Sequence, residues 1–257
     1  MSAPAPVAVV TGASRGIGRQ LCLDLAAAGY DVVATARSSD TSRGRLPGTV
    51  EETARGVEKA GRRALAVGLD GRDVAGVAGL AARVYDELGR CDLVVNNAAL
   101  APPRPALEDK VERWRLAMDV NVNGPFYFVY HFAPRMAEAG GGRVVNISSG
   151  ASQAPEFGRA SYTTTKAALE AMTRSLAHDL RGRVAVNCIQ LELPVWTEGF
   201  AATLPPGVDL PFEDPVIMSD AVLWLARQPL DVTGEVLTIA ELRQRGAVRG
   251  FTPARRG

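Results

Sequence analysis

Residues that bind metals or form disulfides are rare in this sequence. Among its 257 residues there are only three cysteines and two histidines. Cys22, Cys91 and Cys188 each lie beside or within an apolar stretch, which is typical of buried free thiols and unlike a disulfide framework. His131 and His178 have no carboxylate or thiol at the spacing of a metal site, so we expect no bound metal.

The sequence also lacks a strong net charge and a long apolar run. Its 29 lysines and arginines nearly balance its 28 aspartates and glutamates, for a net charge of +1. This balance argues against nucleic acid or any other partner bound by bulk electrostatics. No apolar run is long enough to span a membrane, and no signal-peptide core precedes the first apolar stretch. We therefore expect a cytoplasmic protein with no membrane partner.

Lysine is the scarcest of the charged residue types. Only Lys59, Lys110 and Lys166 are present, and Lys166 follows Tyr162 by four residues. This spacing places both side chains on one face of a helix, where an ammonium can stabilise a phenolate. Tyr162 is therefore a candidate proton donor for carbonyl reduction. Taken alone, the motif also fits a tyrosine and a lysine exposed on a helix surface.

A glycine-rich segment near the N-terminus carries a second signal. The apolar run 7–10 predicts a buried strand, which leads directly into the glycine-rich run 11–18, and a helical pattern follows up to Gly29. Glycines at such a turn let the backbone come close to a pyrophosphate, and the first N–H groups of the helix supply hydrogen bonds and a positive dipole. The order of strand, glycine turn and helix therefore favours nucleotide binding over a plain turn.

Apolar runs alternate with helical patterns along the chain, and 47% of its residues are hydrophobic. This alternation predicts one α/β domain over residues 1–257, with a doubly wound parallel sheet of about seven strands and helices on both faces. Residues 1–6 and 243–257 are expected to be flexible ends. The predicted strands are 7–10, 31–36, 65–69, 93–95, 144–147, 184–189 and 236–239.

An extended loop, 38–48, follows the second predicted strand. Thr49 and Glu52 then have the spacing of a capping box, which predicts a helix that begins there and runs toward Ala60. Asp70 comes directly after the third predicted strand, where an aspartate either forms a turn or contacts a ligand.

These motifs together resemble the short-chain dehydrogenase/reductase family from residue 7 to about residue 242. The run Thr11–Gly18 matches the family's TGxxxGxG motif, and Asn96–Ala99 matches its Asn-Asn-Ala-Gly element except for the final alanine. The family's catalytic tetrad falls on Asn121, Ser149, Tyr162 and Lys166. The resemblance implies a Rossmann-type fold, a nicotinamide cofactor, and assembly as a homodimer or homotetramer.

The resemblance also implies a role for each member of the tetrad. Tyr162 gives a proton to the substrate oxygen, and Ser149 forms a hydrogen bond with that oxygen. Lys166 binds the nicotinamide ribose, and Asn121 holds a water that passes protons to Lys166. We therefore expect an oxidoreductase that transfers hydride between NADP(H) and a carbonyl compound or secondary alcohol, with reduction as the physiological direction.

A set of cofactor contacts follows from the same resemblance. Asp70 is expected at the adenine, and Thr197 at the nicotinamide amide. The full set is Gly12, Ser14, Arg15, Gly16, Ile17, Gly18, Arg37, Asp70, Asn97, Ala98, Tyr162, Lys166 and Thr197.

Charge at the end of the second predicted strand indicates which nicotinamide cofactor is used. Ala36 stands where NAD-dependent members of the family carry an aspartate, and Arg37 follows it. Arg15 lies within the glycine turn. Two arginines without a carboxylate favour the 2′-phosphate of NADP(H), so NAD(H) is the less favoured cofactor. Arg43 and Arg45 are further candidates for this phosphate site.

The expected substrate is a hydrophobic ketone or aldehyde, because the residues placed around the pocket are mostly apolar. These residues are Pro155, Phe157, Leu193, Trp196, Phe200 and Leu204.

The chain departs from the family pattern after the sixth predicted strand. Residues 191–192 are Leu-Glu in place of the usual Pro-Gly pair, so Glu192 is expected to bring an acid close to the nicotinamide ring. Residues 240–242 are Ala-Glu-Leu in place of Asn-Gly-Gly. The lost Pro-Gly pair motivates an alternative function, a catalytically silent NADP(H)-binding sensor or scaffold.

Overall fold

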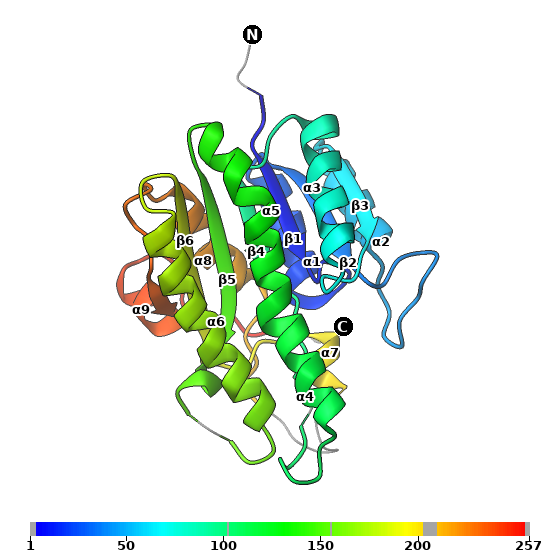
Figure 1. Cartoon of the computed structure of the whole chain (residues 1–257), viewed down its shortest axis with the longest axis vertical. Coiled ribbons are helices and arrows are strands. Elements are labelled where there is room, and N and C mark those ends of the chain that lie inside the picture. Colours follow the sequence, from blue (N-terminus) through cyan, green and yellow to red (C-terminus); the bar gives the residue numbers. More distant parts are fainter. Residues whose placement is uncertain (1–3, 102, 155, 203–209, 255–257) are drawn as a thin grey trace.

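The computed structural model describes residues 4–101, 103–154, 156–202 and 210–254. Within these ranges, seven strands form one parallel sheet in the order β3-β2-β1-β4-β5-β6-β7 (Figure 1). The prediction of a doubly wound parallel sheet is confirmed. The strands are β1 (Val7–Thr11), β2 (Asp31–Ala36), β3 (Ala64–Gly68), β4 (Leu93–Asn96), β5 (Gly142–Ser149), β6 (Val184–Leu191) and β7 (Val236–Thr238).

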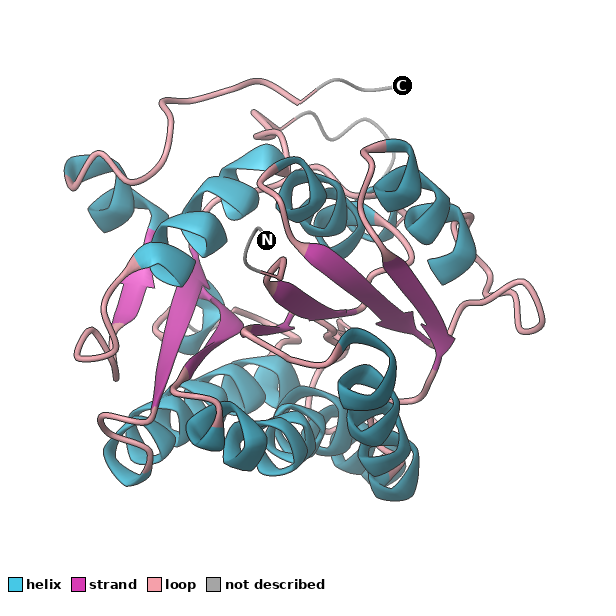
Figure 2. Ribbon diagram, turned by 90° about the horizontal axis from the view of Figure 1, so that it is seen from above, coloured by secondary structure: helices cyan, strands magenta, loops and turns pink. Residues whose placement is uncertain are grey.

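Helices cover both faces of the sheet (Figure 2). One face is covered by α1 (Gly16–Ala27), α2 (Val50–Lys59) and α8 (Val216–Arg227). The other is covered by α3 (Val74–Leu88), α5 (Gly124–Glu138) and α6 (Ala160–Asp179). The shorter elements are α4 (Val111–Met118), the π-helix η1 (Asp119–Asn123), the 3₁₀-helix η2 (Gly150–Ser152), α7 (Glu198–Ala201) and α9 (Ile239–Gln244).

Side chains of the central strand β1 pack on both faces of the sheet. All of its residues are buried. Ala8 and Val10 pack in the cluster that contains α1 and α8, whereas Val7 and Val9 pack in the cluster that contains α3 and α5. Side chains alternate between the faces of a strand, so a strand covered by helices on both sides is apolar along nearly all of its length.

The capping box predicted before α2 is present. Thr49 Oγ1 accepts a hydrogen bond from the backbone N–H of Glu52 at 3.2 Å, and the Glu52 carboxylate accepts one from the Thr49 N–H at 3.3 Å. These bonds satisfy N–H groups that the first turn of a helix leaves without partners. The helix ends at Lys59, next to the predicted end.

Two charged contacts join the C-terminal segment to the rest of the domain. Arg243 pairs with the buried carboxylate of Glu213, and Arg249 pairs with Asp220 at 2.6 Å. A buried carboxylate requires a partner, which fixes the arginine that supplies it. Residues 243–254 therefore pack against the domain, and residues 255–257 lie outside the described residues. At the other end, the carbonyl oxygen of Pro6 accepts a hydrogen bond from the N–H of Asp31.

The strand order reverses direction between β1 and β4. The chain winds outward from β1 through β2 to β3, and then returns to place β4 on the other side of β1. Loops at the carboxyl ends of these two strands leave in opposite directions, which opens a crevice where open α/β sheets bind their ligands.

Candidate active site

The glycine turn between β1 and α1 packs against the loop that follows β4. Gly12 and Gly16 have φ values of +67° and +54°, which L side chains rarely adopt. A Cβ atom on Gly12 would lie 2.9 Å from the Cα of Ala98, and one on Gly18 would lie 2.3 Å from the carbonyl oxygen of Gly12. Glycine at these positions lets the chain turn and lets the two loops meet.

Thr11 and Asn97 fasten the two loops together. Thr11 Oγ1 accepts hydrogen bonds of 3.0 Å from the backbone N–H groups of Asn97 and Ala98. Asn97 Nδ2 donates to the carbonyl oxygen of Thr11 at 2.9 Å. At the start of α1, the N-cap residue Arg15 makes no side-chain capping bond. The first turn of α1 is therefore suited to an anionic ligand.

A cavity of 420 Å³ lies at this junction. Its walls come from the glycine turn, the ends of β2 and β4, the segment after β3, and Thr197. Of the predicted cofactor contacts, all except Tyr162 and Lys166 line this cavity: Gly12, Ser14, Arg15, Gly16, Ile17, Gly18, Arg37, Asp70, Asn97, Ala98 and Thr197.

The side chain of Arg15 holds the extended loop between β2 and α2. Its Nε donates to the carbonyl oxygen of Pro47 at 2.8 Å. Its Nη2 donates to the carbonyl oxygens of Leu46 and Gly48 at 2.9 and 3.1 Å, and to Ser38 Oγ at 3.0 Å. Arg15 therefore shapes the wall of the cavity as well as lining it.

The other arginines near the end of β2 differ in position. Arg37 is exposed and lines the cavity. Arg43 lies 3.7 Å from Asp40, and neither Arg43 nor Arg45 is among the residues that line the cavity. Arg37 is thus the better placed of the three candidates for a phosphate on the ribose.

Asp70 is paired with Arg72, which is not among the site residues predicted from the sequence. Arg72 Nη2 lies 2.7 Å from Asp70 Oδ2, and its Nε lies 3.0 Å from Oδ1. These hydrogen bonds hold the pKa of the Asp70 carboxyl below its ordinary value. Both residues line the cavity, so Arg72 adds a cation to this end of the site and neutralises the acid.

Tyr162 and Lys166 lie one turn apart near the start of α6. The ammonium of Lys166 is 5.5 Å from the centre of the Tyr162 ring, and the Lys166 side chain is buried. Lys166 Nζ donates to the carbonyl oxygen of Ile147 at 2.7 Å. Because Ile147 lies on β5, two residues before Ser149, this bond ties α6 to the strand that ends at the predicted catalytic serine.

A buried carboxylate, Glu170, organises the backbone around Ser149. Its Oε1 accepts hydrogen bonds of 2.6 Å from the hydroxyls of Ser148 and Ser152, which flank Ser149, and one of 3.1 Å from Gln190 Nε2 on β6. Glu170 is not among the site residues predicted from the sequence. Its position one turn after Lys166, on the same helix face, is the signal that points to it.

Asn121 is buried within the π-helix that joins α4 to α5. Its side-chain oxygen accepts from the N–H of Leu100 at 2.7 Å, and its Nδ2 donates to the carbonyl oxygen of Leu100 at 2.8 Å and to Thr165 Oγ1 at 2.9 Å. Asn121 therefore connects the loop after β4 to the helix turn that carries Lys166. Single π-helical turns of this kind are frequent at functional sites.

Glu192 does not bring its acid to the place that the sequence suggested. Its carboxylate accepts hydrogen bonds from the N–H groups of Ile239 and Ala240 at 3.0 and 2.7 Å, at the start of α9. Thr197 still reaches the glycine turn without a Pro-Gly pair. A Cβ atom on Gly16 would lie 3.0 Å from Thr197 Cγ2.

The residues predicted to surround an apolar pocket do not all lie together in the structure. Trp196 lies edge-on to Phe212 with ring centres 5.1 Å apart, and Phe200 lies 5.5 Å from Phe212. Leu193 instead packs against the core beside α1 and α8, and Phe157 is exposed. Apolar character does not reveal which way a loop side chain points. The remaining two residues, Pro155 and Leu204, lie outside the described residues.

A cation lies beside the Tyr162 ring. The guanidinium carbon of Arg159 is 5.5 Å from the ring centre, and Arg159 lies 3.5 Å from the exposed carboxylate of Glu156. Arg159 Nη1 also donates to the carbonyl oxygen of Ala101. The surroundings of the tyrosine are therefore not exclusively apolar.

Cys22, Cys91 and Cys188 are buried free thiols. Burial raises the pKa of the Cys188 thiol to about 12, so it remains protonated near neutral pH. Over the described part of the chain, no cluster of three or more histidine, cysteine, aspartate or glutamate side chains has the arrangement of a metal site. None of the helices in that part is both long and apolar enough to cross a membrane.

Comparison with curated proteins gives two informative relatives. The short-chain type dehydrogenase/reductase of Picea abies is 36% identical over 201 residues, which is 76% of this chain and 73% of that protein. Hydroxysteroid dehydrogenase-like protein 2 of Xenopus tropicalis is 27% identical over 242 residues, or 93% of this chain. The match spans only 58% of the length of that second relative.

Two solved structures cover nearly the whole chain. A metagenomic short-chain oxidoreductase in complex with NADP is 31% identical, with a TM-score of 0.76 and coverage of 92% of this chain and 98% of that one. A short-chain dehydrogenase from Mycobacterium paratuberculosis bound to NAD is also 31% identical, with a TM-score of 0.80 and coverage of 93% and 97%.

The family model described as short chain dehydrogenase matches residues 6–199. This range contains the glycine turn, the π-helical asparagine, the serine at the end of β5, the Tyr-Lys pair and Thr197. The chain therefore belongs to the short-chain dehydrogenase/reductase family of oxidoreductases.

Proposed function

We propose that the protein is an NADP(H)-dependent oxidoreductase that reduces a ketone or aldehyde to the corresponding alcohol. The observation that carries this proposal is the placement of Lys166 beside Tyr162 and against the strand of Ser149. The glycine turn and the cavity at the end of the sheet fit a dinucleotide, since the turn admits close backbone approach and the start of α1 favours a pyrophosphate.

The family resemblance gives the catalytic side chains their proposed tasks, and the contacts of Lys166 fit the task proposed for it. A bound nicotinamide supplies the hydride, and negative charge then develops on the substrate oxygen, which needs a donor already in place. The Tyr162 hydroxyl donates the proton, and the Ser149 hydroxyl donates a hydrogen bond to the same oxygen. Lys166, fixed by the carbonyl oxygen of Ile147, stabilises the negative charge left on Tyr162.

The proposed role of Asn121 comes from the family resemblance. In this chain Asn121 holds Leu100 and Thr165, so it fixes the turn of α6 that carries Lys166. The proposed relay adds a water near Asn121 and Lys166 that returns the proton from solvent.

Local charge supports NADP(H) over NAD(H) as the cofactor. Ala36 leaves no carboxylate at the end of β2, and Arg37 and Arg72 both line the cavity there. The nearby acid, Asp70, is paired with Arg72. Solved relatives carry NADP in one case and NAD in another, so the proposed preference depends on these residues of this chain.

The alternative of a catalytically silent sensor loses its main support. The missing Pro-Gly pair is what motivates this alternative. Glu192 binds the start of α9, and Thr197 contacts the glycine turn.

A homodimer or homotetramer remains part of the proposal. Aromatic side chains are exposed along α4 and α5, and Trp114, Phe126 and Tyr130 are 41%, 41% and 63% exposed. The ring centres of Phe126 and Tyr130 lie 6.0 Å apart, so these two exposed rings are neighbours. Light scattering on the purified protein gives the molar mass directly.

The test of the proposed function is oxidation of NADPH against aliphatic, aromatic and cyclic ketones, their aldehyde counterparts, and oxo acids. The oxo acids are included because of Arg159 beside the Tyr162 ring. Parallel reactions with NADH test cofactor choice. We expect turnover with NADPH for at least one carbonyl class. Tight NADPH binding without hydride transfer to any class would favour the sensor.

A further inference from the structure

Three short segments lie side by side next to Thr197. Residues 194–196 pair with residues 212–214 through a parallel bridge between Val195 and Glu213, and an antiparallel bridge joins Glu213 to Pro253. The C-terminal segment therefore forms the outer edge of a small three-stranded arrangement. Its innermost segment leads directly to Thr197, which contacts the glycine turn.

Glu213 is the central residue of this arrangement. Its backbone N–H donates to the carbonyl oxygen of Pro194, and its carbonyl oxygen accepts from the N–H of Trp196, both at 2.9 Å. On the outer side, the N–H of Asp214 donates to the carbonyl oxygen of Thr252 at 2.9 Å. The backbone of Glu213 thus fixes the two residues that flank Val195.

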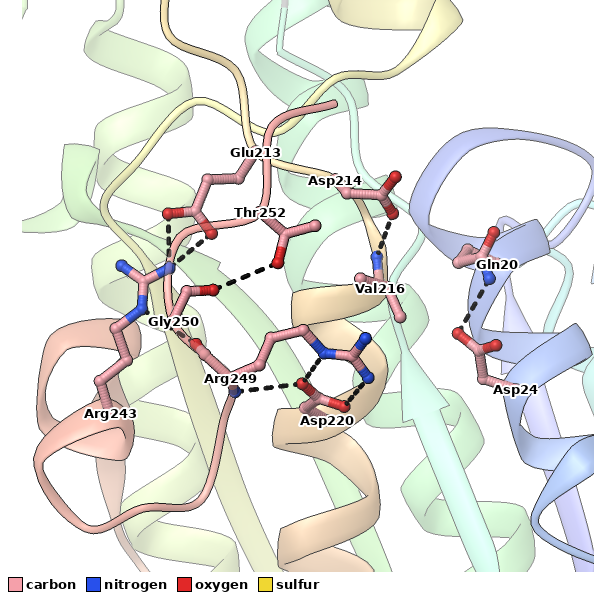
Figure 3. A network of polar contacts seen from close by, with 10 residues as sticks. All are labelled: Gln20, Asp24, Glu213, Asp214, Val216, Asp220, Arg243, Arg249, Gly250 and Thr252. Atoms are coloured by element: carbon pink, nitrogen blue, oxygen red, sulfur yellow. Dashed lines mark hydrogen bonds and ion pairs between the residues drawn. The ribbon is translucent and has the colours of Figure 1, made fainter. Parts of the chain in front are cut away.

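The Glu213 side chain is buried, and Arg243 is its cationic partner among the residues that the structure describes. Both carboxylate oxygens lie 2.5 Å from Arg243 Nη2 on α9 (Figure 3). Glu213 is only 3% exposed, so its charge depends on this pair. Arg243 Nε also donates to the carbonyl oxygen of Arg249 at 3.3 Å, which fastens the start of the C-terminal segment to α9.

The same helix holds the other end of the Thr197 segment. Glu192 accepts hydrogen bonds from the N–H groups of Ile239 and Ala240, at the start of α9. Helix α9 therefore contacts the segment 192–197 in two ways. It binds the Glu192 side chain directly, and its Arg243 binds Glu213, whose backbone pairs with residues 194 and 196. Glu192 and Ala240 each belong to a segment that departs from the family pattern, 191–192 and 240–242, and the two residues are in contact with each other.

We infer that Glu213 is a positioning residue for the cofactor site. Held by Arg243, it fixes residues 194–196 and thereby keeps Thr197 against the glycine turn. This inference rests on the proposed function, because it takes the cavity to be the site of a nicotinamide cofactor.

A neighbouring ion pair provides a matched control. Arg249 binds Asp220 on α8 through two hydrogen bonds, at 2.6 and 2.8 Å (Figure 3). This pair also ties down the C-terminal segment, but neither residue contacts residues 194–197 through a described hydrogen bond. Loss of either pair lowers stability, whereas only the Glu213–Arg243 pair is expected to affect cofactor binding.

The test measures NADPH affinity in full-length Glu213→Gln, Arg243→Met, Arg243→Lys and Arg249→Gln variants, with the thermal midpoint of each. We expect Glu213→Gln and Arg243→Met to weaken NADPH binding by about tenfold or more, which corresponds to about 1.4 kcal/mol. Arg243→Lys should recover much of the affinity, because it keeps the charge. Arg249→Gln should stay within about twofold of the wild type, whatever its midpoint.

Unchanged affinity in both Glu213→Gln and Arg243→Met overturns the inference, and so does an equal loss in Arg249→Gln. If Glu213→Gln fails to fold, the NADPH affinities of Arg243→Met and Arg243→Lys decide whether the inference stands.

If the wild type binds neither NADPH nor NADH, the proposed function fails. Amide hydrogen exchange then tests the positioning role by itself. Faster exchange at residues 195–198 in Arg243→Met but not in Arg249→Gln supports it. Equal exchange in these two variants contradicts it.

Discussion

The ammonium group of Lys166 lies 5.5 Å from the centre of the Tyr162 ring and donates a 2.7 Å hydrogen bond to the carbonyl oxygen of Ile147. One side chain thus faces the proposed proton donor and also holds the strand that ends at Ser149. This double contact explains why a sequence with so few lysines places one at this position.

Replacement of Lys166 by methionine should lower turnover by about 10²–10⁴-fold, because the charge beside Tyr162 is lost. Steady-state NADPH oxidation measures the effect. Lys59→Met is the control, since Lys59 is exposed at the end of α2 and should keep full activity. Equal activity in the two variants would remove Lys166 from the mechanism.

Glu170→Gln should lower kcat by about tenfold, because the amide is uncharged and its NH2 group cannot accept the hydrogen bond that Gln153 Nε2 donates to Oε2 at 3.3 Å. Ser148 and Ser152 then lose a charged acceptor, and the backbone around Ser149 is held less firmly. The KM for the carbonyl substrate should change less than kcat. Glu58→Gln, on the exposed surface of α2, serves as the control. A wild-type kcat in Glu170→Gln would show that the network around Ser149 has no catalytic role.

Ala36→Asp should reverse the cofactor preference. A carboxylate at the end of β2 repels a 2′-phosphate and accepts hydrogen bonds from free ribose hydroxyls. The ratio of kcat/KM for NADPH over that for NADH should fall by about tenfold or more. Arg45→Asp introduces a similar charge outside the residues that line the cavity and should leave the ratio near its wild-type value. A preference for NADH in the wild type would contradict the assignment of Arg37 and Arg72.

Asp31 should make the stability of the fold depend on pH. Burial alone would raise the pKa of the Asp31 carboxyl, but hydrogen bonds from Arg63 and the charge of Arg62 outweigh burial and hold that pKa below its ordinary value of 3.8. Because the pKa is lower in the folded state, this contribution is fully present above pH 3.8 and is lost as the pH falls through the folded-state pKa.

The matching variant is Asp31→Asn, which should lose about 1–3 kcal/mol of unfolding free energy at pH 7. Urea unfolding at several pH values measures this loss, and the difference from wild type should shrink below pH 3.8. If the difference in unfolding free energy between wild type and Asp31→Asn stays constant as the pH falls below 3.8, the charge of Asp31 contributes nothing to stability.

The fold could be predicted because its signals are local. Each of the seven apolar runs became a strand, since a strand covered on both faces is mostly apolar. Two predicted strand residues fall outside their strands. Leu69 follows the end of β3, and Ile239 starts α9, where Thr238 and Glu241 form a capping box. The capping box at Thr49 likewise depends on residues three positions apart.

The partners of the charged side chains could not be predicted in the same way. Glu192 binds Ile239 and Ala240, which come 47 and 48 positions later in the chain, and Glu213 binds Arg243, which comes 30 positions later. Arg15, expected only as a phosphate ligand, also holds three loop carbonyls. Such contacts depend on which loops the folded sheet brings together, and no spacing in the sequence encodes them.

The central claim is that Tyr162 donates the proton during hydride transfer, and Tyr162→Phe tests it most directly. The variant removes one hydroxyl and leaves the ring in place. Single-turnover oxidation of bound NADPH by the best carbonyl substrate should slow by about 10²–10⁴-fold, while the NADPH dissociation constant changes by less than about twofold. A single-turnover rate in Tyr162→Phe equal to that of the wild type would contradict the account.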